Sequence, residues 1–457
     1  MSTSRRFFLG AASAVAASRV WGANDKANIA LVGVGGRGTN HLDNYSRMPE
    51  SRIVAIVDID QAARETANAR LVRNGGEKAK EFEDMRAAFA DPGVDAVSIA
   101  TPNHWHALAT ILAMKAGKDV YCEKPACYNI HEGLEMVKVA HETKKMVQIG
   151  SQHRSTAFKL KAFAALQQGV IGKIYMAKGL CFKRRFAIGK VADSAVPPGV
   201  NWDLFRGPAP MRPFNANRFK YKWHWFWDTG NGDIGNQGVH EMGLCRWALG
   251  DPEWPKTAVA TGGKYAADDD QETPNTLLAS FDYGGREVVF EVRGLLTNPE
   301  GGVGRQITAG PRPAGAPPAG APGAATAIPS NAARPSNPIN VMVGNLFYGS
   351  EGYAVMSDQG FIAYKGESAE VVMDERPERG DATVPHMQNF IAACRSRNPK
   401  DLHDGIDNAH FSAGLCHLAN ISYRVGRKLT IESGPKFAGD SEANKMLTRD
   451  YRKPYVV

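Results

Sequence analysis

The sequence predicts a two-part α/β chain, in which a parallel nucleotide-binding sheet is followed by an α+β domain with a mostly antiparallel sheet. From residue 27 to about 150, short apolar strands alternate with amphipathic helices, which is typical of a parallel sheet. A glycine-rich turn, Gly33-x-Gly35-x-x-Gly38, directly follows the first strand. After Ser151 the strand-like stretches become longer. The 457 residues, 43% of them apolar, are enough for two full cores.

The expected elements follow that division. Strands of the first part are predicted at 28–32, 53–57, 96–99, 119–122 and 146–149, and helices at 61–73, 85–90 and 106–116. The second part is predicted to hold a helix at 157–168 and strands at 174–182, 276–281, 287–293 and 340–343. Residues 383–427 return to helix, because 386–394 and 410–420 each carry an apolar stripe at helical spacing.

The segment 298–338 is rich in Gly, Pro and Ala and has no hydrophobic period. It is either an active-site lid or a linker, and the linker reading is favoured.

The first 23 residues are typical of a twin-arginine export signal. Arg5 and Arg6 precede an apolar stretch to about Ala17, and small residues follow up to Ala23. The twin-arginine export machinery is therefore an expected partner, and the expected location is periplasmic or secreted. Cleavage after Ala23 and retention as an uncleaved anchor both stay open, because Trp21 fits a cleavage site badly. This export route carries folded proteins, so a nucleotide cofactor would have to be tightly bound.

Composition excludes several classes of partner. Lysines and arginines are dispersed despite a net charge of +8, which argues against nucleic acid as a partner. The longest basic cluster, Lys183-Arg184-Arg185, is expected to be a solvated face. No group of residues has metal-ligand spacing, so no metal is expected. The six cysteines contain no Cys-x-x-Cys and are expected to be free, mostly buried thiols.

The glycine-rich turn predicts a bound dinucleotide. Gly33 permits the tight turn, Gly35 lets the backbone approach a pyrophosphate, and Gly38 allows close packing of helix on strand. Asp58 ends the next strand 20 residues after Gly38, where a carboxylate binds ribose hydroxyls and repels a 2′-phosphate. NAD is therefore favoured over NADP, although a contact from Arg37 to a phosphate would blur that preference.

Two polar clusters follow later strands of the first sheet. Thr101-Pro-Asn-His-Trp-His106 comes directly after the strand at 96–99, and Glu123-Lys124-Pro125 after the strand at 119–122. Ligands bind at the carboxyl ends of strands in such sheets. The predicted cofactor-binding residues are Gly33, Gly35, Gly36, Arg37, Gly38, Asp58, Thr101, Asn103, His106, Glu123, Lys124 and Gln152.

The order and spacing of these motifs resemble the glucose-fructose oxidoreductase / inositol dehydrogenase / rhizopine catabolism (Gfo/Idh/MocA) family, from Asn28 to about Arg427. The resemblance implies an N-terminal Rossmann domain, then an α/β domain with a large open sheet whose face often forms a dimer. We expect a signal segment at 1–23, the Rossmann domain at 24–150, and a substrate-binding and oligomerisation domain at 151–457. A homo-oligomer, dimer or tetramer, follows from the same resemblance.

The resemblance also implies nicotinamide-dependent chemistry on sugars or polyols, with Lys124 and a downstream histidine at the reacting hydroxyl. That histidine is expected to be His240. Many relatives carry an aspartate four residues before the histidine, whereas this chain has Asn236 there and Asp233 seven residues before. Either Asn236 or Asp233 is expected to take part in catalysis by orienting His240, and the sequence leaves the choice open.

Aromatic residues crowd the segment 202–227, which holds four of the eight tryptophans. Tryptophan faces stack on the C–H surface of sugar rings, while core packing is the alternative for most of them. The predicted substrate-binding residues are His104, Trp105, His153, Arg154, Trp223, Trp225 and Trp227.

The sequence therefore favours an exported sugar oxidoreductase with tightly bound NAD(H). Because no soluble NAD pool is expected outside the cytoplasm, a second sugar would reoxidise the cofactor in place. An NAD-dependent glycoside hydrolase, which recycles its NAD in each turnover, is the main alternative. A non-catalytic sugar-binding protein is a third, and the presence of both Lys124 and His240 argues against it.

Overall fold

The computed structural model describes residues 26–300, 339, 341–377, 382–432 and 434–457. The predicted export signal and nearly all of the Gly/Pro/Ala-rich segment lie outside the described residues. Within the described part, no helix is long and apolar enough to cross a membrane. All six cysteines are free and buried.

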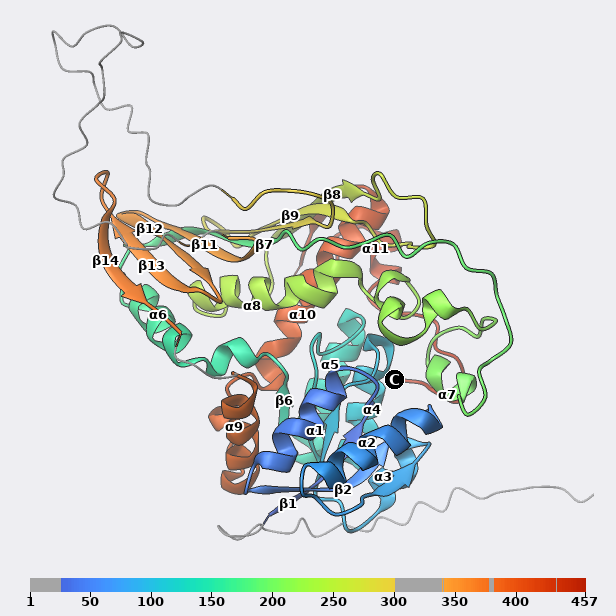
Figure 1. Cartoon of the computed structure of the whole chain (residues 1–457). Coiled ribbons are helices and arrows are strands. Elements are labelled where there is room, and N and C mark those ends of the chain that lie inside the picture. The colour runs from blue at the N-terminus through green and yellow to red at the C-terminus, as the bar shows by residue number, and fades with distance from the viewer. Residues whose placement is uncertain (1–25, 301–338, 340, 378–381, 433) are drawn as a thin grey trace, which may run out of the picture.

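The first sheet is a parallel Rossmann sheet of six strands, in the order β3-β2-β1-β4-β5-β6, with helices on both faces (Figure 1). Its strands are β1 (Ala27–Val32), β2 (Ser51–Val57), β3 (Lys80–Phe82), β4 (Ala96–Ile99), β5 (Asp119–Cys122) and β6 (Val147–Ile149). Its helices are α1 (Arg37–Arg47), α2 (Gln61–Arg73), α3 (Met85–Ala90), α4 (Asn103–Lys115) and α5 (Ile130–Thr143). The parallel fold class is confirmed, and β3 is an additional edge strand that the sequence analysis did not predict.

The second sheet has nine strands, in the order β14-β13-β12-β11-β7-β10-β9-β8-β15, and every neighbouring pair is antiparallel except β7 and β10. The mostly antiparallel second domain is thereby confirmed. The strands are β7 (Ile174–Cys181), β8 (Thr257–Gly263), β9 (Thr276–Asp282), β10 (Glu287–Arg293), β11 (Val343–Gly349), β12 (Gly352–Ser357), β13 (Gly360–Lys365), β14 (Glu370–Glu375) and β15 (Leu429–Thr430). The strand expected at 340–343 is misplaced, since β11 begins only at Val343.

Helices fill the space between the two sheets (Figure 1). The helix α8 (Val239–Ala248) packs on β7, β10 and β11, and α10 (Ile406–Val425) contacts both β8 and α5. The remaining helices of this part are α6 (Ala157–Gln167), α9 (Thr383–Ser396) and α11 (Ser441–Lys445). Met387 and Phe390 of α9 belong to the core of the first sheet, so the C-terminal chain returns to pack on the Rossmann domain.

A long segment, residues 183–232, leaves β7 and runs around the edge of the Rossmann domain before the chain enters α8 (Figure 1). We call it the strap. It holds α7 (Trp202–Arg206) and two short 3-10 turns, Ala216–Arg218 and Lys220–Trp225. The backbone N–H of Asn201 donates to Ile59 O at 2.9 Å, and that of Gln61 donates to Gly199 O at 2.9 Å. The strap is thus hydrogen-bonded to the loop that follows β2.

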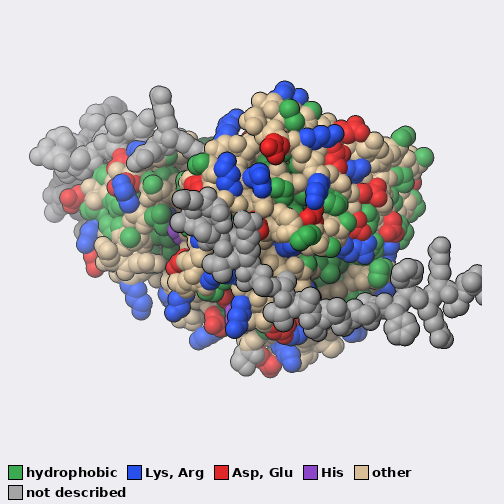
Figure 2. All heavy atoms as spheres, turned by 90° about the horizontal axis from the view of Figure 1, so that it is seen from below, with side chains coloured by type: hydrophobic (Ala, Val, Ile, Leu, Met, Phe, Trp, Pro, Cys, Tyr) green, Lys and Arg blue, Asp and Glu red, His purple; other side chains and the backbone are tan. Residues whose placement is uncertain are grey.

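Charged side chains of both signs are interspersed over the face seen from below (Figure 2). Arg185 departs from the solvated basic face expected for residues 183–185, because its guanidinium is paired with the buried carboxylate of Asp233.

Candidate functional site

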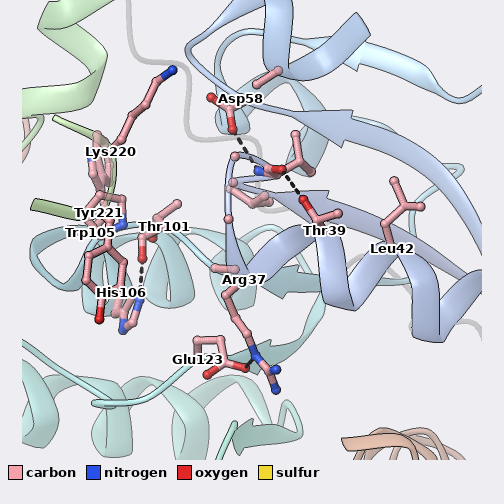
Figure 3. Close-up of a pocket in the computed structure, with 18 of the residues that line it drawn as sticks. Arg37, Thr39, Leu42, Asp58, Thr101, Trp105, His106, Glu123, Lys220 and Tyr221 are labelled. Atoms are coloured by element: carbon pink, nitrogen blue, oxygen red, sulfur yellow. Dashed lines mark hydrogen bonds and ion pairs between the residues drawn. The ribbon is translucent and has the colours of Figure 1, made fainter. Parts of the chain in front are cut away.

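A cavity of about 1020 Å³ lies between the glycine-rich turn, the two polar clusters, the strap and the start of α8. Asp58 and His240 both line it. Lys220 and Tyr221 of the strap lie across the pocket from Asp58 and Arg37 (Figure 3). The cavity therefore joins residues from both parts of the chain and is large enough for an extended cofactor together with a small substrate.

The glycines at the nucleotide end differ in what they contact. Gly33 has φ +83°, and a Cβ there would lie 2.7 Å from Ala100 O. A Cβ on Gly38 would lie 1.8 Å from Gly33 O, so the packing of α1 on the turn requires glycine. In contrast, a Cβ on Gly36 would meet no described atom within 4 Å, although the residue lines the cavity. This open cradle at the start of α1 fits a pyrophosphate.

Asp58 follows β2 and braces that cradle. Its Oδ2 accepts a hydrogen bond from the Val34 N–H at 2.8 Å, and its Oδ1 accepts one from the Asp60 N–H at 3.0 Å. Burial raises the pKa of this carboxyl group, and the hydrogen bonds from the two backbone N–H groups lower it by a smaller amount. Each oxygen has a second lone pair, so the carboxylate can still accept ribose hydroxyls from the cavity side.

Glu123 is the centre of a buried polar cluster beside the cradle. Its Oε1 accepts from Arg37 Nε at 2.9 Å and from Gln152 Nε2 at 3.1 Å, and it lies 2.9 Å from His41 Nε2. Burial alone would raise the pKa of Glu123, but Arg37 and His41 hold it well below its usual range. Arg37 is thus directed to Glu123 (Figure 3) and also donates to Thr383 Oγ1 at 3.3 Å.

The cluster 101–106 begins α4 and ties the Rossmann domain to the rest of the site. Asn103 Nδ2 donates to Asn231 Oδ1 at 2.9 Å, and Trp105 Nε1 donates to Leu204 O at 2.9 Å. His106 has Nδ1 2.7 Å from Pro125 O and Nε2 2.8 Å from Thr101 O. These buried contacts fix the loop that carries Lys124 and hold the strap in place.

Lys124 lies at the reacting end of the cavity, at the end of β5. Its Nζ donates to Asn236 O at 2.5 Å and lies 3.5 Å from Asn236 Oδ1. Burial lowers the pKa of the Lys124 ammonium, with Glu123 acting in the opposite direction. A larger share of the lysine is therefore in the neutral, basic form than in a lysine exposed to water.

Asn236 and Asp233 form a network beside Lys124, and neither makes the hydrogen bond to Nδ1 of His240 that an orienting role would require. Asn236 Nδ2 donates to Tyr221 Oη at 3.1 Å and to Asp233 Oδ1 at 3.3 Å. Arg185 donates to both carboxylate oxygens of Asp233, at 2.6 and 2.9 Å. A π-helical turn, Ile234–Gly238, carries Asn236 just before α8, a local irregularity often found at functional sites. Asn236 therefore contacts Lys124 directly through its backbone carbonyl.

His240 extends from the first turn of α8 into the cavity. Among the described residues, no hydrogen-bond partner reaches its buried Nδ1. The ring of His153 lies across from it, with 5.0 Å between centroids and 75° between planes. Burial and the Lys124 charge hold the pKa of His240 well below its usual range. The imidazole is therefore neutral at neutral pH and can accept a proton.

The predicted substrate residues fall into two groups. Trp105, His153 and Trp223 line the cavity. Four others are missing from the described residues that line it: His104, Arg154, Trp225 and Trp227. His104 lies under the strap with Nε2 2.8 Å from Phe205 O, and Arg154 pairs with Asp251 at 2.6 Å.

Several cavity residues were missed by the sequence analysis. Lys159, Lys220, Tyr221, His224 and Asp358 all line the cavity. Tyr221 and His224 lie in the aromatic segment, which was the one available signal. Lys159 and Asp358 lie far apart in the sequence and outside any motif, so no pattern could bring them together.

Comparisons with known proteins match both parts of the chain. A family model described as an oxidoreductase family with an NAD-binding Rossmann fold matches residues 27–151, and that family's C-terminal alpha/beta domain matches residues 163–288. The chain is 31% identical over 179 residues to inositol 2-dehydrogenase of Rhodococcus jostii, a match that covers 38% of this chain and 46% of that protein. It is 26% identical over 154 residues to a glycosyl hydrolase family 109 protein of Shewanella baltica, covering 33% and 34%.

These curated relatives are thus matched over less than half of their length. Solved structures resemble the fold of this chain over most of its length. A levoglucosan dehydrogenase structure with NADH and levoglucosan has a TM-score of 0.62 at 16% identity, over 90% of this chain and 100% of that one. The WlbA dehydrogenase of Bordetella pertussis, with NADH and UDP-GlcNAcA, has a TM-score of 0.59 at 18% identity, over 90% and 98%. At such identities the likeness shows the fold.

Proposed function

We propose that this chain, which belongs to the Gfo/Idh/MocA family of oxidoreductases, exchanges a hydride between bound NAD(H) and a ring carbon of a sugar or sugar derivative. One observation carries the proposal: Lys124 and His240 line the same cavity as the glycine cradle and Asp58. Inositol and levoglucosan dehydrogenases are among the proteins that the chain resembles, which favours a polyhydroxylated substrate.

The residues at the reacting end are suited to proton transfer. Bound NAD supplies a nicotinamide ring that accepts or returns a hydride. Neutral Lys124 and neutral His240 can each accept the proton of a substrate hydroxyl, and their protonated forms return it in the reverse reaction. The network of Asn236, Asp233 and Tyr221 keeps Lys124 directed into the cavity. Lys124 and His240 are therefore sufficient for general acid–base catalysis at the reacting oxygen.

The cofactor assignment is tested at Asp58. Asp58→Ala is expected to weaken NAD binding by about 1–3 kcal/mol, since hydrogen bonds from ribose to a charged group are lost, and to lessen the preference over NADP. Asp58→Asn is the matched control, because its amide oxygen can still accept the Val34 N–H while the repelling charge is gone. Titration calorimetry with NAD and NADP measures both effects. Unchanged NAD affinity in Asp58→Ala would mean that Asp58 does not bind ribose.

Tight retention of the cofactor forms part of the proposal, and the strap supports it. The strap carries Phe205, Phe219 and Trp223 to the cavity wall and is hydrogen-bonded to the loop after β2. At the C-terminus, Arg452 pairs with Asp203 of α7 at 2.7 Å and braces the strap from outside. We expect release of a bound nucleotide to require these contacts to open, and dissociation therefore to be slow.

Export is also proposed, on the sequence of the first 23 residues. Replacing both Arg5 and Arg6 by lysine is expected to leave the protein in the cytoplasm, because lysine lacks the guanidinium geometry that an arginine pair presents for recognition. Arg19→Lys, outside the pair, is the control and is expected to be exported normally. Cell fractionation with immunoblotting gives the answer. Normal export of the double variant would refute the twin-arginine assignment and remove the main reason to expect cofactor retention.

A hydrolytic net reaction is the second candidate, favoured by the resemblance to glycosyl hydrolase family 109 proteins. Oxidation of a ring hydroxyl, elimination of the aglycone, addition of water and return of the hydride would use the same Lys124 and His240. Incubation with aryl glycosides and with free sugars, without external NAD, separates the two candidates. Phenol release selects the hydrolase, whereas keto-sugar formation with reduction of a second sugar selects the oxidoreductase.

Self-association through the second sheet is proposed as well. Its strands alternate buried and exposed residues, and they expose Tyr175 on β7, Val259 on β8 and Leu278 on β9. Apolar side chains on an open sheet face are suited to a partner copy. Analytical ultracentrifugation of wild type and Leu278→Glu tests this proposal.

A further inference from the structure

Four cavity-lining side chains connect the reacting end of the site with the surface. His240 faces the ring of His153 at 5.0 Å between centroids. Lys159 Nζ donates to His153 Nδ1 at 2.6 Å and to Asp358 Oδ1 at 3.0 Å. All four line the same cavity, and the Asp358 side chain is 86% exposed. The series therefore begins at the proposed base and ends in solvent.

Lys159 is the unusual member of this series. It lies on α6, and the residue is only 2% exposed. A buried ammonium is costly unless it is paired, and here the pairing carboxylate is an exposed residue on the turn between β12 and β13. No motif or core function accounts for a lysine that joins a cavity histidine to a surface carboxylate.

The contact between Lys159 and His153 has two protonation states. With Lys159 as the ammonium, Nδ1 of His153 accepts the hydrogen bond, so the neutral ring carries its proton on Nε2. With Lys159 as the neutral amine, the direction reverses and Nδ1–H donates, which leaves Nε2 free to accept a proton. Burial lowers the pKa of Lys159 and lowers that of His153 to about 3, so neutral forms of both are accessible.

We propose that His153, Lys159 and Asp358 form a proton path between His240 and solvent. The inference rests on the proposed function, because a proton has to leave the site only when a substrate hydroxyl is oxidised there. His153 and Lys159 act through His240 in this account, so they are proton-transfer residues that need not touch the substrate.

Oxidation of the substrate hydroxyl separates one hydride from one proton. In the substrate, the C–H and O–H bonds break and the C=O bond forms; both electrons leave with the hydride taken by oxidised nicotinamide, so only a proton remains. His240 accepts that proton and passes it to Nε2 of His153. Nδ1 of His153 releases its own proton to the neutral amine of Lys159. The resulting ammonium gives a proton to the Asp358 carboxylate, whose side chain is 86% exposed and releases the proton to water, and each group regains its starting state as the histidine tautomer resets.

Other titratable groups face this path and modulate it. Lys124 at the end of β5 and His386 on α9 both lower the pKa of His153. Glu241 on α8 is 2% exposed, and burial raises its pKa to about 8. Its charge, where present, favours the Lys159 ammonium. The pH dependence of the path therefore reflects the whole cluster.

The first test needs no sugar. Histidine side-chain nitrogen spectra of the ¹⁵N-labelled holoprotein are compared for wild type, Lys159→Met and Asp358→Asn, with Lys161→Met as the control. Lys161 lies on the same helix, but its side chain is 62% exposed and pairs with Glu375. We expect Lys159→Met to shift the Nδ1 resonance of His153, and Lys161→Met to leave it unchanged. An unchanged His153 signal in Lys159→Met would show that the contact is absent and overturn the path.

The second test is kinetic. Turnover of myo-inositol, levoglucosan and D-glucose is measured in buffers with and without imidazole. We expect Lys159→Met to lower kcat roughly tenfold or more, with little change in KM, and added imidazole to restore turnover because it carries the proton instead. A kcat equal to wild type, or a loss that imidazole does not restore, would overturn the path alone. A wild type whose bound nucleotide changes redox state with none of these sugars and with no aryl glycoside would overturn the proposed function, and the path with it.

Discussion

Replacing Lys124 by methionine is expected to lower turnover by roughly two to four orders of magnitude, the usual contribution of a positioned acid or base. Methionine keeps most of the buried stem of the side chain while removing Nζ, which donates to Asn236 O at 2.5 Å. The loss should therefore fall on kcat, with the fold intact by circular dichroism. The measurement is steady-state kinetics on the substrate that the incubations with free sugars and aryl glycosides identify.

His240→Ala is expected to show a loss of similar size and to retain its nucleotide, because we assign nucleotide binding to the glycine cradle and Asp58, and His240 to the substrate. Lys161→Met on the exposed side of α6 is the control for removal of a lysine charge. The pH profile adds a check: burial lowers the pKa of Lys124, so the rise of activity with pH should occur below the ordinary titration range of lysine. Near-normal activity in both Lys124→Met and His240→Ala would refute the mechanism for either net reaction.

Gly36→Ala is expected to weaken NAD binding without destabilising the protein. A Cβ at this position meets no described atom within 4 Å, so the protein itself has room for the methyl group. The same space is where a pyrophosphate would approach the start of α1. We expect the affinity for NAD to fall at least about tenfold, or ~1.4 kcal/mol, with an unchanged melting temperature of the nucleotide-free protein.

Gly38→Ala gives the opposite pattern and serves as the comparison. Its Cβ would lie 1.8 Å from Gly33 O, a backbone atom, so the turn and α1 would have to move apart. The nucleotide-free protein should therefore lose stability as well as affinity. Thermal unfolding and NAD titration of both variants separate the two effects, and a Gly36→Ala variant that binds NAD normally would place the pyrophosphate elsewhere.

Local patterns predicted the Rossmann sheet well, because its strands are short, buried and separated by amphipathic helices. The predicted strands 96–99 and 119–122 coincide with β4 and β5. The edge strand β3 escaped prediction because Lys80 and Glu81 are exposed, and its strand character comes from pairing with β2. The start of β11 was placed too early, since the apolar residues 341–343 are typical of a strand although only Val343 belongs to β11.

The candidate site was predictable only where it consists of motifs. Lys124 could be assigned because it lies in Glu-Lys-Pro after a strand, but its contact with Asn236 joins residues 112 positions apart. The hydrogen bond of Lys159 to Asp358 spans 199 positions and depends on how α6 packs beside the β12–β13 turn. Arg185 was expected in a solvated basic run, because the sequence gives no sign that Asp233 lies beside it. Such long-range pairings follow from tertiary packing.

The central claim, that this cavity holds NAD(H) and uses it on a sugar, has one direct test. Protein purified without added cofactor is denatured, and the released nucleotide is identified by mass spectrometry, before and after incubation of the native protein with single sugars. We expect NAD(H) at close to one equivalent per chain, and a shift from NAD to NADH with at least one sugar. Absence of nucleotide, or bound NAD whose redox state no sugar or glycoside changes, would contradict it.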